Sequence, residues 1–326
     1  MTLKISLALS IFSGAADRYC IEGYRDSLKL QERISAAAKL KGVKAVELEQ
    51  TDITLEFSAK DVKRMLKDYN LECSCVTANM VSDRRFALGA FGNQHQKTRN
   101  AAIDEGRKAV DIARTLGAPL VTLRLYTDGF DYPFQVDYGA HWNTVISSIK
   151  TISKYASPDI NVAIAYKPRE PRKNLTVATV GKSLSLCQEI AMKNVGVGMS
   201  FSHALMAGEN PAESIAFLSR ANKLFQVYFS DCYRQTDDGL MPGSVNMWEL
   251  LETLFYLRTC KHKGFLTLDM LPQRLDPSHA CQIAIGNMSI FWKKLDKMDT
   301  SEIRRAQKSM DAVESQKIIR RIMLQG

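Results

Sequence analysis

Short runs rich in β-forming residues alternate with amphipathic helical runs along most of the chain, and this alternation limits the possible folds more than any other feature. A strand followed by a helix, repeated, gives parallel strands because each helix carries the chain back to the edge where the strands begin. Eight strand-like runs occur, at residues 4–11, 45–49, 72–78, 120–125, 161–167, 195–201, 224–230 and 265–270. Eight helical runs follow them in turn, at residues 28–41, 59–70, 97–116, 140–155, 177–193, 211–221, 245–260 and 277–295.

Eight strand–helix units predict an α/β fold that closes into a (β/α)8 TIM barrel, in preference to an open doubly wound sheet. No Gly-x-Gly-x-x-Gly follows the first strand-like run, which argues against a dinucleotide-binding sheet. Asn210-Pro211 and Gly117 are typical of a helix start and a helix end, and both fit this division. We expect one barrel over residues 1–298. An additional C-terminal helix within residues 299–326 would form an extension and not a separate domain.

Alternation within two strand-like runs predicts which side chains point into the barrel. In residues 161–167 and 195–202, large apolar residues alternate with small or polar ones. Large residues pack against the surrounding helices, whereas the narrow interior accepts small ones. Barrel active sites form at the carboxyl ends of the strands, the mouth of the barrel. The residues expected inside, close to the mouth, are Ala165, Lys167, Ser200 and Ser202.

Charge and cysteine usage narrow the cellular context. The chain has 44 Lys and Arg against 35 Asp and Glu, a formal charge of +9, but the basic residues are spread along helices and form no basic–aromatic stripe. We therefore expect solvated helix faces and no nucleic-acid partner. Of the seven cysteines only Cys73 and Cys75 are paired in sequence, which favours free thiols in a reducing compartment. No secretory signal or apolar run of about 18 residues is found, so we expect a cytoplasmic protein without a membrane partner.

Four stretches at strand ends resemble a known family. They are Asp128-Gly-Phe-Asp-Tyr-Pro-Phe-Gln135, Tyr166-Lys-Pro-Arg-Glu-Pro-Arg172, Ser202-His-Ala-Leu-Met-Ala-Gly-Glu-Asn-Pro211 and Asp269-Met-Leu-Pro-Gln-Arg274. Together they resemble the xylose-isomerase-like barrel superfamily, and the resemblance extends to about residue 295. Members include aldose–ketose isomerases, epimerases, dehydratases, endonucleases of abasic sites and barrel subunits of C-glycoside-cleaving enzymes. The resemblance therefore implies the fold and leaves the substrate open.

The resemblance also implies a divalent metal, held by a carboxylate from strand five, an aspartate from strand six, a histidine from strand seven and a carboxylate from strand eight. The matching positions in this chain are Ala165, Ser200, Tyr228 and Asp269, so only Asp269 keeps a ligand type. We therefore expect no metal and no other cofactor, with Mn²⁺ or Mg²⁺ as the disfavoured alternative.

Lys167, His203 and Asp269 are the candidate catalytic residues, because each ends or follows a barrel strand. The Lys167 ammonium would fill space left by a metal and stabilise an oxyanion. The alternative is that Lys167 pairs with Asp269 or Glu170 as structural filling. His203 is equally compatible with a structural histidine.

A second set of residues, taken from the loops and strand ends around the same mouth, is predicted to bind substrate. Arginines bind hydroxyl-rich or anionic groups through paired N–H donors, although Arg172 also suits a role in bracing its loop. Trp142 suits either stacking on a ring or packing at a helix start. The set is Arg169, Arg172, Asp231, Tyr228, His141 and Trp142.

Two functions remain open. The first is a barrel protein that acts on or binds a sugar or glycoside without the divalent metal, with isomerase, epimerase or C-glycoside-lyase chemistry if it is an enzyme. The alternative is a non-catalytic barrel subunit, a pseudoenzyme that works with a partner protein. A homo- or hetero-oligomer is expected in either case. An endonuclease is disfavoured, because five histidines are few for a site with several metal ions.

Overall fold

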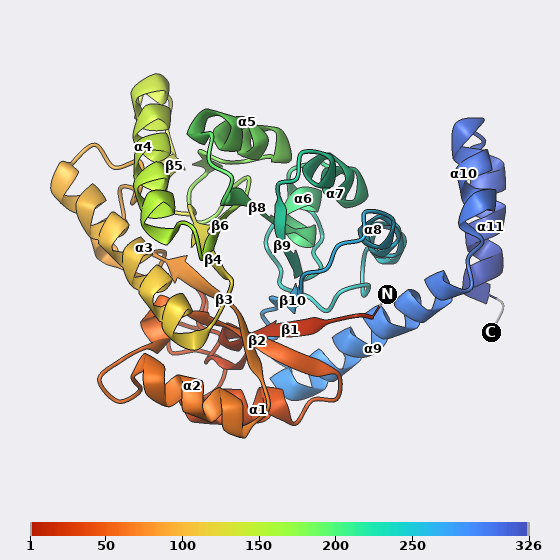
Figure 1. Cartoon of the computed structure of the whole chain (residues 1–326), viewed down its shortest axis with the longest axis horizontal. Coiled ribbons are helices and arrows are strands. Elements are labelled where there is room, and N and C mark those ends of the chain that lie inside the picture. Colours follow the sequence, from red (N-terminus) through yellow and green to blue (C-terminus); the bar gives the residue numbers. More distant parts are fainter. Residues whose placement is uncertain (1, 325–326) are drawn as a thin grey trace.

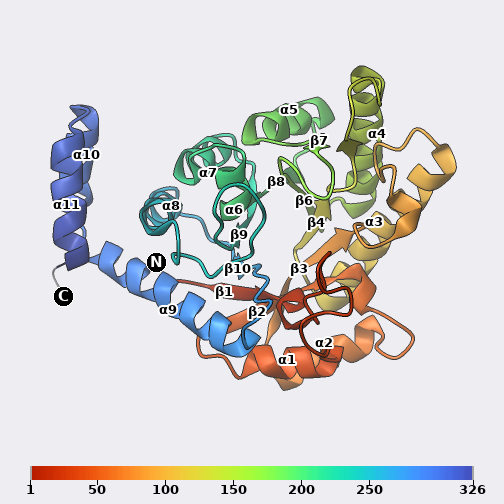
Figure 2. The same cartoon turned by 180° about the vertical axis from the view of Figure 1, so that it is seen from behind.

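Eight parallel strands close into a barrel in the computed structural model, which describes residues 2–324. The hydrogen-bonded order around the barrel is β1-β10-β9-β8-β6-β4-β3-β2, with β2 returning to β1. Figures 1 and 2 show the helices arranged around the strands. The predicted (β/α)8 barrel is therefore confirmed.

The barrel strands lie where the sequence predicts them, although most are shorter than the runs. They are β1 (Ile5–Ala8), β2 (Val43–Glu49), β3 (Glu72–Asn79), β4 (Leu120–Arg124), β6 (Asn161–Ala165), β8 (Val195–Ser200), β9 (Leu224–Phe229) and β10 (Leu266–Leu268). A separate antiparallel pair, β5 (Gly129–Phe130) and β7 (Asn174–Leu175), joins the loops after β4 and β6. These loops are thus tied together above the mouth.

The helices also match the predicted runs. They are α1 (Leu30–Ala38), α2 (Ala59–Asp68), α3 (Gln96–Leu116), α4 (Tyr138–Ala156), α5 (Val180–Ile190), α6 (Phe201–Met206), α7 (Pro211–Arg220), α8 (Met247–Thr259), α9 (Pro277–Asp296), α10 (Thr300–Lys308) and α11 (Ala312–Leu324). The Asn210 side chain accepts hydrogen bonds from two backbone N–H groups at the start of α7, and Gly117 ends α3 with φ of 79°. Both predicted helix boundaries are confirmed. The short helix α6, directly after β8, was not predicted.

Residues 300–324 form two helices where the sequence predicted one. Met310 has φ of 54°, and the Asp311 carboxylate accepts a hydrogen bond from the backbone N–H of Glu314. A left-handed residue followed by a capping aspartate ends one helix and starts the next. Figures 1 and 2 show α10 and α11, here called the C-terminal arm, standing away from the barrel beyond α9.

The barrel interior has an apolar lower layer and a polar upper layer. Cys75, Leu120, Ala163 and Phe225 form an apolar cluster separate from the main core between strands and helices. Gly196 makes room for this layer, because a Cβ at that position would lie 2.4 Å from the Phe225 ring. Closer to the mouth the enclosed side chains are mainly polar. They include Glu47, Thr77, Thr122, Gln226, Tyr228 and Thr267.

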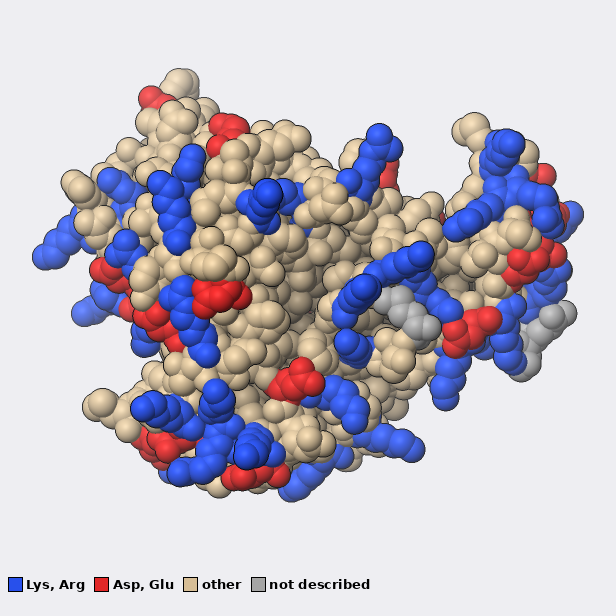
Figure 3. Space-filling model, viewed as in Figure 1, with Lys and Arg blue, Asp and Glu red and all other residues tan. Residues whose placement is uncertain are grey.

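The surface charge is mixed. Figure 3 shows Lys and Arg side chains distributed over the face in view, with Asp and Glu among them. All seven cysteines are free. No helix among residues 2–324 is long and apolar enough to cross a membrane.

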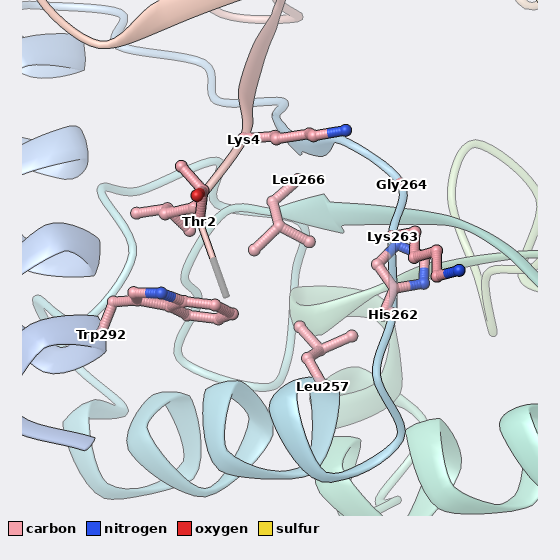
Figure 4. Close-up of a pocket in the computed structure, with 9 residues that line it drawn as sticks. Thr2, Lys4, Leu257, His262, Lys263, Gly264, Leu266 and Trp292 are labelled. Carbon is pink, nitrogen blue, oxygen red and sulfur yellow. The ribbon is translucent and has the colours of Figure 1, made fainter. Parts of the chain in front are cut away.

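A cavity of about 220 Å³ lies at the amino ends of β1 and β10, opposite the mouth. Figure 4 shows Trp292, Leu257 and Leu266 around it, with His262 on the side away from Trp292. The His262 Nε2 atom is buried and has no hydrogen-bond partner among the described residues. Burial lowers the pKa of His262 to about 4, because the charged ring would lose its hydration.

His262 should make the fold sensitive to acid. The unfolded chain binds a proton near the ordinary value of 6.5 and the folded chain only near 4, so stability is lost as the pH falls through this window. The full shift corresponds to up to about 3 kcal/mol. Urea unfolding at pH 7 and pH 4.5 should therefore show a smaller loss in His262→Leu than in the wild type. His279→Leu, which removes an 85% exposed side chain, is the matched control and should lose as much stability as the wild type.

Candidate active site

A carboxyl group is buried in the upper layer of the barrel. The Glu47 side chain, on β2, accepts hydrogen bonds from the hydroxyls of Thr77 (2.5 Å) and Tyr228 (3.2 Å) and from the amide of Gln226 (3.1 Å). The Tyr228 hydroxyl also contacts the Thr122 hydroxyl at 2.8 Å. Burial raises the pKa of Glu47 to about 7, although the nearby Arg124 opposes the rise. Glu47 therefore titrates near neutral pH.

Arg124, at the end of β4, lies above Glu47. It contacts carboxylates from β2 and from the segment after β10. Its guanidinium donates a hydrogen bond to Asp269 at 2.9 Å and lies 3.6 Å from Glu49 and 3.7 Å from Glu47. The guanidinium carbon is also 5.9 Å from the centre of the Tyr228 ring. Burial raises the pKa of Glu49, against the effect of Arg124. We call Arg124, Glu47, Glu49 and Asp269 the Arg124 cluster.

A second group of charges surrounds Asp237, in the loop after β9. The Asp237 carboxylate accepts hydrogen bonds from Lys167 Nζ at 2.9 Å and His203 Nε2 at 3.0 Å. Burial opposes ionisation of Asp237, but the neighbouring His203 and Lys167 hold its pKa well below the ordinary value. Lys167 also lies 3.5 Å from Glu170. We call Lys167, Glu170, His203 and Asp237 the Lys167 cluster.

His203 is held at both ring nitrogens. Its Nδ1 atom lies 3.0 Å from the carbonyl oxygen of Tyr166, and Nε2 faces Asp237. Both ring nitrogens are therefore occupied by protein groups, and His203 fixes the Asp237 carboxylate beside Lys167.

Tyr126 lies between the two clusters. Its ring meets His203 edge-on at 5.7 Å, and Lys167 Nζ is 5.5 Å from the ring centre. Burial raises the pKa of the Tyr126 phenol. The charge of Arg124 lowers this pKa, and the charge of Asp269 raises it. The two clusters are therefore parts of one site at the mouth.

Two buried aspartates fix the surrounding loops. Asp231 accepts hydrogen bonds from the backbone N–H groups of four residues, Cys232, Gly243, Val245 and Asn246, and from the Asn246 side chain. Asp128 accepts three hydrogen bonds from the backbone of residues 90–92. Such fully occupied carboxylates hold backbone in place and have little capacity left for a ligand.

The remaining predicted substrate-binding residues lie around the mouth or outside it. Arg172 donates to the Thr127 carbonyl and pairs with Asp131 at 2.5 Å, so it braces its loop, as the alternative prediction held. Arg169 donates to the carbonyls of Gln235 and Met206. His141 is buried against Thr176 at 2.8 Å. The Trp142 indole donates to Glu189 of α5, in the outer helical layer.

The three candidate catalytic residues are divided between the clusters. Lys167 and His203 meet at Asp237, while Asp269 pairs with Arg124 and not with Lys167. Sequence reasoning missed Glu47, Glu49, Arg124, Tyr126 and Asp237. For Arg124 and Tyr126 a signal existed, because they lie two residues apart at a strand end and therefore share the inward face.

The four positions that match the family's metal ligands do not fit a divalent ion. Ala165 has no side-chain oxygen, and the Ser200 hydroxyl contacts that of Ser202 at 3.1 Å. The Tyr228 hydroxyl faces Glu47 and Thr122, and Asp269 pairs with Arg124. Among residues 2–324 no three His, Cys, Asp or Glu side chains are arranged to hold a metal. The donor set at this mouth thus differs from the one that the resemblance implies.

Comparisons with known proteins agree on the fold. The family model described as xylose isomerase-like TIM barrel matches residues 34–258. The xylose isomerase of Thermus thermophilus is 28% identical over 190 residues, and that of Thermus caldophilus is 27% identical over the same length; each match covers 57% of this chain and 49% of the relative. The chain therefore matches about half the length of these curated relatives.

Solved structures with this barrel have low sequence identity to the chain. The 3-keto-D-glucoside 4-epimerase of E. coli has a TM-score of 0.69 at 14% identity, covering 88% of this chain and 99% of that structure. The D-psicose 3-epimerase of Clostridium cellulolyticum H10 has a TM-score of 0.69 at 13% identity, covering 89% and 99%. At such identities the likeness establishes the fold alone.

Glu47 should make stability fall as the pH rises. Its folded pKa of about 7 lies above its ordinary value of 4.5, so its contribution is complete below 4.5 and is lost as the pH rises through 7. The shift corresponds to about 3 kcal/mol. Glu47→Gln mimics the protonated carboxyl, and it should therefore gain stability over the wild type between pH 5 and pH 8 in urea unfolding. Equal pH dependence of the two proteins would contradict this account.

Proposed function

Because this chain belongs to the xylose isomerase-like TIM barrel family, we propose that its mouth binds a sugar or glycoside and acts on it without a divalent metal. The single observation that supports this most directly is the concentration of charged groups at the carboxyl ends of the strands, where Lys167 and His203 are fixed by Asp237 and Asp269 by Arg124. Two solved structures with this barrel are sugar epimerases, which is consistent with the proposal.

The charges of the site favour a neutral, hydroxyl-rich ligand. Arg124 contacts three carboxylates and Lys167 contacts two, so these cations are already paired. A phosphate would have to compete with those carboxylates, whereas sugar hydroxyls donate to carboxylates and accept from ammonium groups at once.

In the proposed reaction, Lys167 donates a hydrogen bond to a carbonyl or hydroxyl oxygen of the ligand and stabilises negative charge that develops there. His203 positions Asp237, and through it Lys167, for this contact. A carboxylate of the Arg124 cluster accepts the proton from a ligand carbon and returns it. Asp269 is 27% exposed at the side chain and Glu49 26%, so both remain accessible from the mouth. The raised pKa of Glu49 suits a group that accepts and returns a proton.

A panel of aldoses, ketoses, C- and O-glycosides and sugar phosphates tests the proposal. A neutral sugar or glycoside should raise the melting temperature saturably, and turnover in D2O should place deuterium on a ligand carbon, as seen by NMR. Lys167→Met should weaken binding about tenfold or more, because a charged hydrogen bond contributes about 1.5–3 kcal/mol. Lys173→Met, in the same loop but exposed, should bind as the wild type does. Neither stabilisation nor deuterium uptake with any neutral member would contradict the proposal.

A non-catalytic subunit that works with a partner protein is the second candidate function. The observation that favours it is a groove of about 480 Å³ between α8 and the C-terminal arm. Its apolar lining includes Trp248, Phe255 and Ile319, and Met310 and Val313 on the arm are exposed. Light scattering of the purified full chain, alone and with candidate partners, distinguishes a monomer from a homo- or hetero-oligomer. A strictly monomeric chain that binds no partner would contradict this second function.

A further inference from the structure

We propose that Arg124 is the resident cation of the mouth and takes the electrostatic place that a divalent metal would have there. This charge would organise the site whichever ligand the mouth binds. The groups that this chain has at the positions of the implied metal ligands differ from those ligands, and only Asp269 keeps a ligand type.

Carboxylates from the two strands that flank β1 converge on Arg124, which extends from β4. Glu47 and Glu49 come from β2 and Asp269 follows β10, and all three lie within 3.7 Å of guanidinium nitrogens. Removing one cation from among three acidic side chains in a largely buried place would leave repulsion without compensation. A positive charge is therefore a structural requirement of this end of the barrel, and Arg124 supplies it.

Asp269 is the decisive partner, because it is the one position that keeps a metal-ligand type. Its carboxylate accepts the 2.9 Å hydrogen bond from Arg124, which occupies one of its two oxygens. A divalent ion bound at Asp269 would lie beside a permanently charged guanidinium and would be repelled by it.

Arg124 is also fixed where it stands. Its side chain is 12% exposed, it extends from the last residue of β4, and it lies against the Tyr228 ring. Gly198, whose Cβ position would be 3.4 Å from that ring, leaves Tyr228 room inside the barrel. Because this cation is part of a covalently attached side chain, a chelator cannot remove it. Lys167 does not have the same role, because its nearest carboxylate is Asp237.

Manganese binding to three variants tests the inference. Protein treated with chelator and dialysed is titrated with Mn²⁺, and free Mn²⁺ is followed by electron paramagnetic resonance. The wild type and Arg124→Lys, which keep the positive charge, should bind no stoichiometric Mn²⁺ at the mouth. Arg124→Met, which keeps volume but not charge, should bind Mn²⁺ at least tenfold more tightly. Adding Asp269→Asn to Arg124→Met should abolish the gain, because the ligand carboxylate is then lost.

Two results would overturn the inference. One is stoichiometric Mn²⁺ binding by the wild type with the affinity of Arg124→Met, and the other is no gain of Mn²⁺ binding in Arg124→Met. If Arg124→Met does not fold, the double variant Arg124→Met/Glu47→Gln removes a buried carboxyl together with the cation and serves for the same titration. Because the readout is metal binding and not sugar binding, failure of this inference is distinguishable from failure of the proposed function.

Discussion

A carboxyl group enclosed by a barrel needs partners that replace water, and the site of this protein is arranged around that need. Glu47 has its oxygens satisfied by Thr77, Gln226 and Tyr228 and its charge opposed by Arg124. Unpaired burial of such a group would cost several kcal/mol, about what a small protein has as its whole margin of stability. The polar upper layer of the barrel is therefore required for folding as well as for function.

The parallel barrel makes this arrangement possible because alternate residues of every strand face one narrow interior. Thr122 and Arg124 lie two residues apart on β4, so both side chains face the interior. Thr122 contacts Tyr228 within the polar upper layer, whereas Arg124 contacts Asp269. The glycines of β8 leave room for the large rings of β9, Phe225 below and Tyr228 above. Small residues on one strand thus leave space for large residues on the next, so a tyrosine fits inside a barrel that is otherwise lined by small groups.

The sequence predicted the barrel well because strand and helix periodicity is local and repeats eight times. It also placed Lys167, His203 and Asp269 near the mouth, because each follows a strand. It could not reveal that Asp237 joins the first two, since Asp237 lies in an irregular loop whose path depends on Asp231 and the backbone it binds. Glu47 and Arg124 were missed because a charged residue in a strand is ordinarily exposed, and only closure of the barrel encloses it.

Two neighbouring positions on one helix also show what could not be predicted from the sequence. His141 and Trp142 were predicted together as ligand contacts, yet successive helical residues point about 100° apart. His141 turns inward to Thr176, and Trp142 turns to Glu189 on the next helix. A sequence motif therefore indicates which loop reaches the mouth, whereas the helical phase decides which of its side chains does.

A guanidinium at the centre of the mouth would also limit the chemistry available there. Arginine donates directional hydrogen bonds and stabilises negative charge, but it cannot lower the pKa of a coordinated hydroxyl as a divalent metal does. Proton transfer would then depend on carboxyls whose pKa values burial has raised towards neutrality, as with Glu47, or above the ordinary value, as with Glu49. Glu49 is the more accessible of the two, since its side chain is 26% exposed against 2% for Glu47. A metal-free barrel of this kind would therefore rely on the desolvation of its own acids for reactivity that a metal would otherwise provide.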